Sequence, residues 1–304
     1  MADREPGCPV GSRHLSDRST CHSPDMTGSS AEHRGFWNRP ATWKAFVLVA
    51  GYLVYYLAVS QLIGLLFGDE IDDDVLANPT SMFFALVLPI GLGAIGLLVF
   101  TARVGWLRDI FGPQPIGGSR WMWIAPVLVV AAIVGHVGGT DWSQWTGGEI
   151  AMLAVAGLCI GLAEELATRG LAVKMLRDAG RSERVVAIVS SLLFALMHTT
   201  NLISGMKVST VAATVGYTFC FGMCMYLSMR VTGTIWAAIV LHGLTDPTTF
   251  LSTGGIDEAV SNQGAGWVAV ASVATIAFCL LALVSALIVR GKVAAPSASS
   301  PVEA

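Results

Sequence analysis

The chain has 304 residues, of which 54% are hydrophobic and only 13% are charged, and its mean hydropathy is +0.64. Soluble domains carry about twice that share of charge, so this composition excludes an ordinary soluble protein and indicates a multi-pass protein of the lipid bilayer. The formal net charge of −3 and the pI near 6.0 leave no basic excess, which argues against a nucleic acid as a partner.

The two ends of the chain are predicted to lie outside the membrane. Residues 1–43 are polar and rich in Ser, Arg, Asp and His, without the apolar run of a signal peptide, so we expect a disordered N-terminal tail. Residues 291–304 are rich in Ala, Ser and Pro and predict a flexible C-terminal tail. Residues 44–290 between them are expected to form one helical membrane domain, with a functional core at about 150–250.

Apolar stretches in this domain are long enough to cross about 30 Å of hydrocarbon as helices. In chain order they cover residues 44–67, 80–102, 122–140, 150–177, 185–203, 208–229, 233–250 and 265–289. The expected fold class is therefore an all-α membrane protein with about eight transmembrane helices.

The distribution of Lys and Arg predicts how these spans are oriented. Basic residues gather in the segments that share a side with the chain ends, whereas the opposite side carries only Lys207 and an acidic run from Asp69 to Asp74. Because cytoplasmic segments of membrane proteins are enriched in Lys and Arg, both termini are predicted to be cytoplasmic.

Ionisable side chains are rare inside the spans and gather in the fourth, fifth and seventh. The main ones are Glu164, Glu165, Arg169, His198, His242 and Asp246. A charge inside the hydrocarbon costs at least a few kcal/mol, so such residues indicate a functional site. His136 stands alone in the third span, and we interpret it as a core histidine.

The ionisable groups of three different spans are predicted to lie at one depth. Basic residues mark the cytoplasmic ends of these spans: Arg177, Arg184 and Arg230. Counted from those ends, Glu164, His198 and His242 all lie roughly 18–21 Å above the cytoplasmic surface. Helices that run in opposite directions thus bring one carboxylate and two imidazoles to the same level, which predicts a single site.

Spacings of four residues place several of these side chains on shared helix faces. Glu165 and Arg169 are expected to pair, which leaves Glu164 to point elsewhere. Two other pairs have the same spacing, His242 with Asp246 and Phe194 with His198. One turn before Glu164, glycines at 157 and 161 form a GxxxG pattern, which predicts that a neighbouring helix comes close.

This set of side chains is suited to two related forms of chemistry. A carboxylate with imidazoles in a low-dielectric cavity can deprotonate a water and polarise a carbonyl, as peptide hydrolysis demands. The four groups Glu164, His198, His242 and Asp246 are also suitable ligands for zinc. The residues alone do not choose between the two, and each of them singly would also serve as a polar contact between helices.

Three motifs in this region resemble those of the CAAX prenyl endoprotease family, also called the ABI or CPBP family. Glu164, Glu165 and Arg169 are similar to its EExxxR motif, and Phe194 with His198 to its FxxxH motif. His242 and Asp246 resemble the third motif, HxxxN or HxxxD. Each motif alone is weak, but their order within apolar spans is specific.

The resemblance implies an intramembrane peptidase whose polar cavity opens toward the cytoplasm. By this likeness Glu164 is expected to be the general base, supported by Glu165 and Arg169, and Phe194 is expected to line the substrate cavity. His198 would hold the catalytic water with Glu164, while His242 and Asp246 would stabilise the oxyanion or orient the substrate. Family members are described both with and without a metal, so zinc stays open as a cofactor.

Two departures from the family pattern affect the expected site. Between the glutamates and Arg169 the family favours bulky residues, whereas this chain has Ala167 and Thr168, which would widen the cavity. The third motif ends in Asp246 rather than Asn, and a carboxylate is the poorer oxyanion donor.

The function expected from the sequence is that of an intramembrane endopeptidase in the cell membrane. Its substrate is expected to be a membrane-associated peptide or protein, with a prenylated protein and a bacteriocin-related peptide as alternatives. A proton-coupled transporter or a non-catalytic membrane scaffold would use the same buried polar residues, and the oligomeric state is left open.

Overall fold

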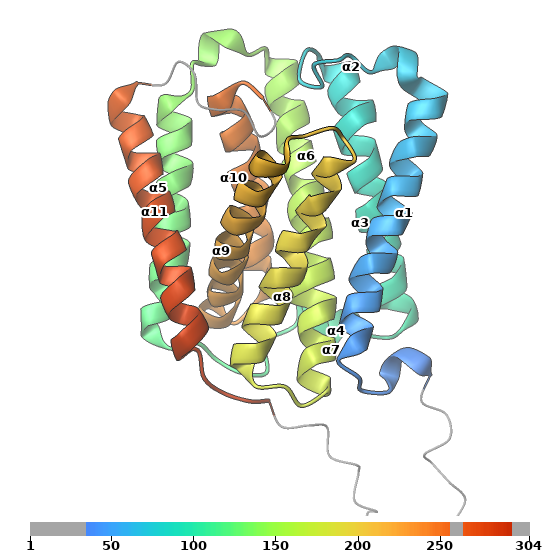
Figure 1. Cartoon of the computed structure of the whole chain (residues 1–304), viewed down its shortest axis with the longest axis vertical. Helices are drawn as coiled ribbons and strands as arrows, with labels where there is room; N and C mark the ends of the chain where they lie inside the picture. The colour runs from blue at the N-terminus through green and yellow to red at the C-terminus, as the bar shows by residue number, and fades with distance from the viewer. Residues whose placement is uncertain (1–34, 256–263, 294–304) are drawn as a thin grey trace, which may run out of the picture. The chain divides into compact units, whose positions relative to one another are not determined.

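The computed structural model describes residues 35–255 and 264–293, and within these ranges the chain forms helices and no strands (Figure 1). The long helices are α1 (Trp43–Phe67), α3 (Leu88–Arg103), α5 (Ile124–Gly139), α6 (Gly147–Glu165), α8 (Glu183–Met197), α9 (Val208–Thr232), α10 (Ile235–Thr253) and α11 (Ala265–Ile288). Three α-helices are short: α2 (Pro79–Met82), α4 (Leu107–Phe111) and α7 (Val173–Asp178). Two π-helical segments, η3 (Phe83–Val87) and η6 (Leu166–Ala172), each continue directly from an α-helix. Short 3₁₀ segments make up the rest: η1 (Phe36–Asn38), η2 (Gly68–Glu70), η4 (Arg120–Trp123), η5 (Trp142–Gln144) and η7 (His198–Leu202).

Each of the predicted spans coincides with a helix or a continuous helical run, and the all-α membrane fold is confirmed. In the described part of the chain, seven runs are long and apolar enough to cross a membrane. They are Trp43–Glu70, Pro79–Arg103, Arg120–Gly139, Gly147–Asp178, Glu183–Leu202, Val208–Thr232 and Ala265–Ile288. The eighth predicted span corresponds to α10, which is not among them. This helix carries a histidine, an aspartate and several threonines along its length, and these polar residues lower its hydropathy.

Local sequence signals define the ends of the helices that carry the polar residues. Thr146 and Glu149 form a reciprocal capping box at the start of α6. Between α9 and α10, Gly233 adopts a left-handed conformation with φ of 74°, which a residue without Cβ does at no steric cost. The turn is therefore tight, and α9 and α10 run antiparallel beside each other.

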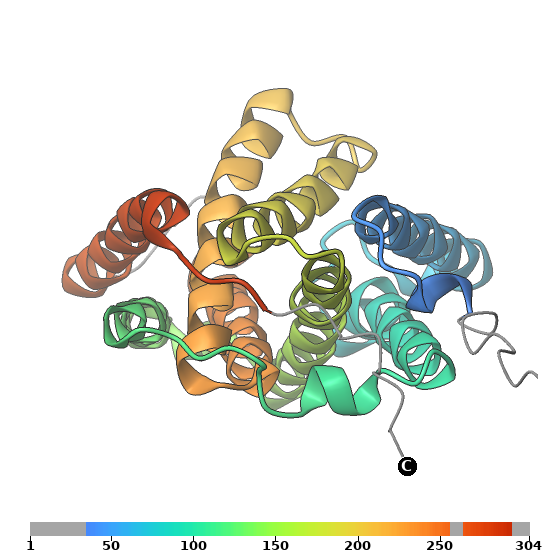
Figure 2. The same ribbon diagram turned by 90° about the horizontal axis from the view of Figure 1, so that it is seen from below.

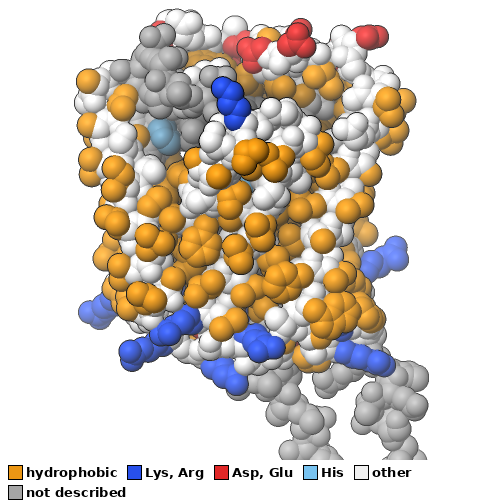
Figure 3. Space-filling view, in the orientation of Figure 1, with side chains coloured by type: hydrophobic (Ala, Val, Ile, Leu, Met, Phe, Trp, Pro, Cys, Tyr) orange, Lys and Arg blue, Asp and Glu red, His pale blue; other side chains and the backbone are white. Residues whose placement is uncertain are grey.

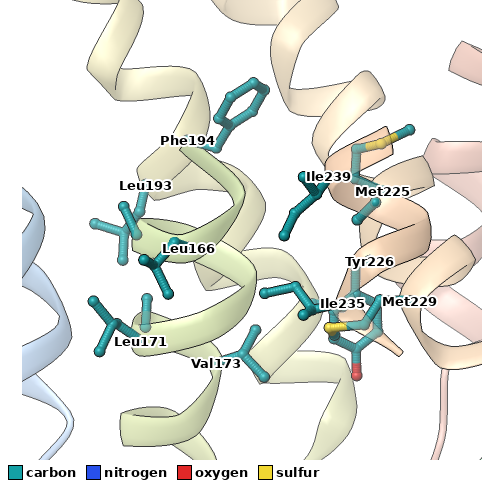
Figure 4. Packing of buried hydrophobic residues seen from close by; sticks show 14 of the residues in the cluster. Leu166, Leu171, Val173, Leu193, Phe194, Met225, Tyr226, Met229, Ile235 and Ile239 are labelled. Carbon is teal, nitrogen blue, oxygen red and sulfur yellow. The ribbon is translucent and has the colours of Figure 1, made fainter. Parts of the chain in front are cut away.

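The run formed by α6, η6 and α7 lies at the centre of the bundle (Figure 2). In this run 50% of the most apolar 18-residue segment is buried inside the protein, whereas the corresponding share is 22% in the run that contains α1. Helices α3, α8 and α10 surround it, while α5 and α11 pack together at one side (Figure 2). Buried side chains from η6, α8, α9 and α10 form the core below the polar residues (Figure 4). They include Leu166, Leu171, Phe194, Met225 and Ile239.

The two ends of the bundle carry opposite charge (Figure 3). We call the end that carries α4, α7 and both described chain ends the basic end, and by the bounds of the helices it holds Arg108, Arg177, Arg181, Arg230 and Arg290. The opposite or acidic end carries the connections from α1 to α2 and from α5 to α6, with Asp69, Asp72, Asp73, Asp74 and Asp141, and the connection from α8 to α9, with Lys207. The charge asymmetry that the sequence predicted is thus a property of the folded bundle.

A buried ionic network joins the helices at the basic end. Glu183 is fully buried and binds the Arg177 guanidinium through two hydrogen bonds of 2.8 Å each. Its Oε2 also accepts hydrogen bonds from Arg230, at 2.9 Å, and from the Tyr226 hydroxyl. The network therefore connects α7, α8 and α9, and the Glu183 amide reaches further to the carbonyl of Gly291.

The described part of the predicted N-terminal tail folds onto the bundle. The Lys44 ammonium donates hydrogen bonds to the carbonyls of Phe36 and Arg39, and the indole of Trp106 donates to Asn38 at 2.6 Å. Residues 36–39 are therefore held against the start of α1 and against Trp106. The rest of both predicted tails, residues 1–34 and 294–304, lies outside the described residues.

Candidate active site

Three neighbouring helical segments bring the predicted site residues together in the middle of the bundle. Glu164 and Glu165 end α6, and Arg169 follows in η6. His198 begins η7 directly after α8, and His242 and Asp246 lie in α10. The sequence predicted that Glu164, His198 and His242 lie at one depth in the membrane, and in the fold they lie around one site.

Close contact between α6 and α10 sets the spacing of these groups. A Cβ atom on Gly157 would lie 2.2 Å from the carbonyl oxygen of Gly243, and one on Gly161 would lie 2.4 Å from that of Ile239. Only glycine allows backbones to approach so closely, so the prediction from the GxxxG pattern is confirmed. The contact places the carboxylates of α6 directly against His242 of α10.

Glu165, Arg169 and His242 form a fully buried polar unit, with relative exposures of 0%, 1% and 2%. Glu165 Oε1 accepts a hydrogen bond from Arg169 Nη1 at 3.1 Å and lies 2.8 Å from His242 Nδ1. Because an ionised carboxylate only accepts, Nδ1 of His242 is the protonated nitrogen in this contact. The expected pairing of Glu165 with Arg169 is confirmed, and it fixes the orientation of the imidazole.

Phe194 packs against this polar unit from the side of α8. The Arg169 guanidinium lies over its ring at 4.5 Å from the centroid, and the His242 and His198 rings meet it edge-on at 5.4 and 5.1 Å. Phe194 is only 1% exposed and is not among the residues that line the site cavity. The sequence-based placement of Phe194 in the substrate cavity therefore differs from the structure, in which its ring supports the charged groups from behind.

Glu164 occupies a different environment from its neighbour Glu165. Its side chain is 17% exposed, and its Oε2 lies 3.8 Å from His242 Nε2. Asp246 Oδ2 lies 3.5 Å from the same nitrogen, and its side chain is 28% exposed. Nε2 of His242 is therefore the ring nitrogen that faces both carboxyl groups.

His198 stands across the site from the α10 groups. Its Nδ1 lies 3.1 Å from the carbonyl oxygen of Phe194, one turn earlier in the chain. Because a carbonyl can only accept, Nδ1 is the donor and Nε2 is the nitrogen left to interact elsewhere. Glu164 and His198 line the same cavity, so both are accessible to a bound molecule.

This cavity has a volume of about 460 Å³, within the range of small-ligand sites. Its polar lining includes Glu164, His198, Asp246, Asn201, Thr214 and Thr249. Its apolar lining includes Leu86, Ile90, Ile160 and Phe250. A smaller cavity of about 110 Å³ adjoins it, and Glu164 and His198 line both.

Sequence reasoning missed the contribution of α1 to the site. Tyr52 and Tyr56 of this helix line the smaller cavity together with Glu164. Two aromatic residues in an apolar span carry no motif, and only their spacing of one helical turn could have placed them on one face. His136 is explained by another contact, because its Nδ1 lies 3.3 Å from the hydroxyl of Thr249 on the cavity wall.

The larger cavity extends from Glu164 toward the acidic end of the bundle. Its walls come from the half of each helix nearest that end: the first turns of α9, the last turns of α10 and the first half of the run Pro79–Arg103. Thr253 lines both this cavity and a surface hollow at the acidic end that is also lined by Asp74 and Asp141. The first and last described residues, by contrast, lie at the basic end of the bundle.

The part of the chain that builds this site matches a known family. Residues 146–248, about a third of the chain, match the family model described as type II CAAX prenyl endopeptidase Rce1-like. These residues form an Rce1-like domain. The family resemblance drawn from the three motifs is thereby confirmed, and the domain falls among CAAX-protease-type hydrolases. No curated protein and no solved structure matches the chain.

The Rce1-like domain contains every residue predicted to be catalytic but only part of the cavity. Glu164, Glu165, Arg169, His198, His242 and Asp246 all lie within residues 146–248. The cavity walls formed by α1 and by the run Pro79–Arg103 lie outside the matched range. The chemistry of the site therefore belongs to the domain, while part of its shape comes from the preceding helices.

The predicted zinc ligands are only partly drawn together. Within residues 35–255 and 264–293, no group of three or more His, Cys, Asp or Glu side chains forms a metal site. His242 Nε2 nevertheless lies 3.5 Å from Asp246 Oδ2 and 3.8 Å from Glu164 Oε2, and neighbouring ligands of a tetrahedral zinc ion are about 3.3 Å apart. The contact between His242 Nδ1 and Glu165 is also of the kind that orients a ligating histidine, so these contacts leave zinc open as a cofactor.

Proposed function

We propose that this protein is an intramembrane endopeptidase that cleaves a peptide bond of a membrane-associated substrate with a water activated by Glu164. The observation that carries the proposal is the contrast between two adjacent carboxylates. Glu165 is fully buried and bound to Arg169 and His242, whereas Glu164 is partly exposed at the cavity. One carboxylate orients the site and the other is accessible to water.

In the proposed reaction Glu164 takes a proton from a water held between its carboxylate and His198. The resulting hydroxide attacks the carbonyl carbon of the scissile bond, so that a C–O bond forms and the carbonyl oxygen becomes an oxyanion. His242 Nε2 lies between Glu164 and Asp246, and a proton on this nitrogen would stabilise the oxyanion. When the C–N bond breaks, Glu164 returns its proton to the leaving amine.

The buried ion pair between Arg169 and Glu165 supports the role of Glu164 as a base. Arg169 donates to Glu165 rather than to Glu164, so among the described contacts of Glu164 no guanidinium neutralises it. His198 and Glu164 belong to different helices whose relative position is fixed by packing around Phe194. Rigid placement of the base and its partner imidazole lowers the entropic cost of positioning water.

No step of this proposal passes through a metal ion. Incubation of the purified protein with a strong zinc chelator, followed by its removal, is therefore expected to leave the cleavage rate unchanged. A loss of activity that added zinc restores would show that the reaction needs the metal.

The test of the proposal compares peptide termini in membranes from cells that express the wild type or Glu164→Gln at equal levels. Glutamine keeps the shape of the side chain but cannot take a proton, so products of the wild type are expected to disappear. Glu70→Gln is the matched control, because Glu70 is exposed and lies outside the site. Identical termini in all three samples, from folded proteins, would refute the proposal and favour a transporter or a scaffold.

The expected opening of the site to the cytoplasm is not part of this proposal. The chain is a multi-pass membrane protein, and its larger cavity is lined by the helix halves nearest the acidic end.

A further inference from the structure

We propose that the catalytic cavity opens on the non-cytoplasmic side of the membrane, so that the substrate is a peptide segment exposed on that side. This proposal rests on the proposed function, because it assigns a side and a substrate class to the same cavity. Two features of the bundle carry it, the separation of charge between its ends and the position of the cavity walls.

The charge of the two ends gives the orientation of the bundle. The described Lys and Arg residues other than Arg169 and Lys207 lie at the basic end. At or next to helix ends on that side stand Arg39, Lys44, Arg103, Arg108, Arg120, Lys174, Arg177, Arg181, Arg184, Arg230, Arg290 and Lys292. Cytoplasmic segments of membrane proteins carry an excess of Lys and Arg, so the basic end faces the cytoplasm. The acidic end, with its aspartates from Asp69 to Asp74, then faces the opposite side.

The cavity is reached from the acidic end. In Figure 1 the connection between α8 and α9 lies below the upper ends of α1 and α10, so this hairpin does not extend to the level of its neighbours. Asn201 and Thr210 flank that connection and line the cavity, as does Thr253 in the last turn of α10. Water and a peptide would therefore approach Glu164 past these three residues.

The site is closed toward the basic end. Every residue from Glu165 to Val173 is buried, which makes this stretch a continuous floor below Glu164. A hollow of about 340 Å³ at the basic end reaches Arg169, but Glu164, His198 and Asp246 do not line it. The buried pair of Glu165 and Arg169 therefore separates that hollow from the catalytic cavity.

This arrangement restricts the class of substrate. A scissile bond must lie on a loop, tail or helix end that is exposed on the non-cytoplasmic side, or on a peptide that has been exported. A segment held at the cytoplasmic surface would have to cross the Glu165–Arg169 floor to reach Glu164.

Accessibility of single cysteines tests the side of the opening. In a background in which the six cysteines are replaced, we would introduce Thr253→Cys and Thr214→Cys in the cavity wall. Asp73→Cys at the acidic end and Arg108→Cys at the basic end are the reference positions. Each variant is treated with a membrane-impermeant thiol reagent in sealed right-side-out vesicles and again after permeabilisation.

We expect both cavity cysteines and Asp73→Cys to be modified in sealed vesicles, and Arg108→Cys only after permeabilisation. Protection of the cavity cysteines until permeabilisation, or modification of Arg108→Cys in sealed vesicles, would overturn the proposal. Asp73→Cys reports the orientation even if a cavity variant fails to fold. Labelling requires no catalysis, so this pattern without Glu164-dependent cleavage would refute the proposed function and leave the side of the opening established.

Discussion

Gly161→Ala should separate α6 from α10 and disable the site while leaving the protein folded. A Cβ at this position would lie 2.4 Å from the Ile239 carbonyl oxygen and 2.8 Å from the Gly243 amide nitrogen. Both are backbone atoms, so no side-chain rotation can relieve the contact. Carbon–oxygen contacts between helices are found at about 3.3–3.6 Å, so the two helices must move apart by about 1 Å.

A shift of this size acts directly on the buried polar unit. The distance between His242 Nδ1 and Glu165 Oε1 is 2.8 Å, and an added 1 Å would take it beyond hydrogen-bond range. Displacement of a catalytic group by about 1 Å costs about 100-fold in rate. Overpacking of this kind lowers the free energy of unfolding by about 1–3 kcal/mol.

The assay compares the cleavage rate and the thermal unfolding midpoint of purified wild type, Gly161→Ala and Gly51→Ala in one detergent. Gly51 lies in α1 with no atom within 4 Å of a Cβ built there, so its variant should keep the wild-type rate. A wild-type rate for Gly161→Ala would refute the view that the glycine contact sets the geometry. So would an equal loss of activity in both variants.

The remaining predictions concern single side chains of the polar clusters. Glu183→Ala leaves two buried guanidinium groups without their carboxylate, so the free energy of unfolding should fall by about 3–5 kcal/mol; an unchanged unfolding midpoint would contradict this. Asp246→Asn should retain cleavage, because the amide keeps a polar group at 3.5 Å from His242 Nε2. Asp246→Ala should lose cleavage, and equal cleavage rates for the two variants would show that no polar group is needed at this position. Phe194→Leu removes the ring beneath Arg169, a contact worth about 2 kcal/mol when desolvated, and a calorimetric scan should therefore show a lower midpoint for this variant than for the wild type.

The helices and the polar centre were predictable from sequence because both depend on simple periodicities. Apolar runs of the right length coincide with the helical runs, and the i,i+4 spacing of Glu165 with Arg169 gives their observed contact. The direction in which Phe194 points was not predictable, because a neighbouring buried cation attracts its ring away from the cavity.

Features that depend on packing between distant helices could not be obtained in this way. The contribution of Tyr52 requires that α1 lies against the site, and no motif in the chain encodes that neighbour. The proposed direction of the opening rests on where the α8–α9 hairpin ends relative to α1 and α10. His136 has a partner on α10 that only the three-dimensional arrangement places beside it.

The position of Glu164 on a cavity wall inside the bundle has a consequence for how a substrate would be recognised. In an α-helix each backbone carbonyl accepts a hydrogen bond from the amide four residues later, within a cylinder of side chains about 10–12 Å across. Under the proposed function, a membrane-spanning substrate would therefore have to unwind locally before its carbonyl could reach Glu164. Glycine, proline or other weak points in the substrate helix would then decide where cleavage occurs. Selectivity would follow from the mechanical weakness of the substrate more than from the identity of any one of its side chains.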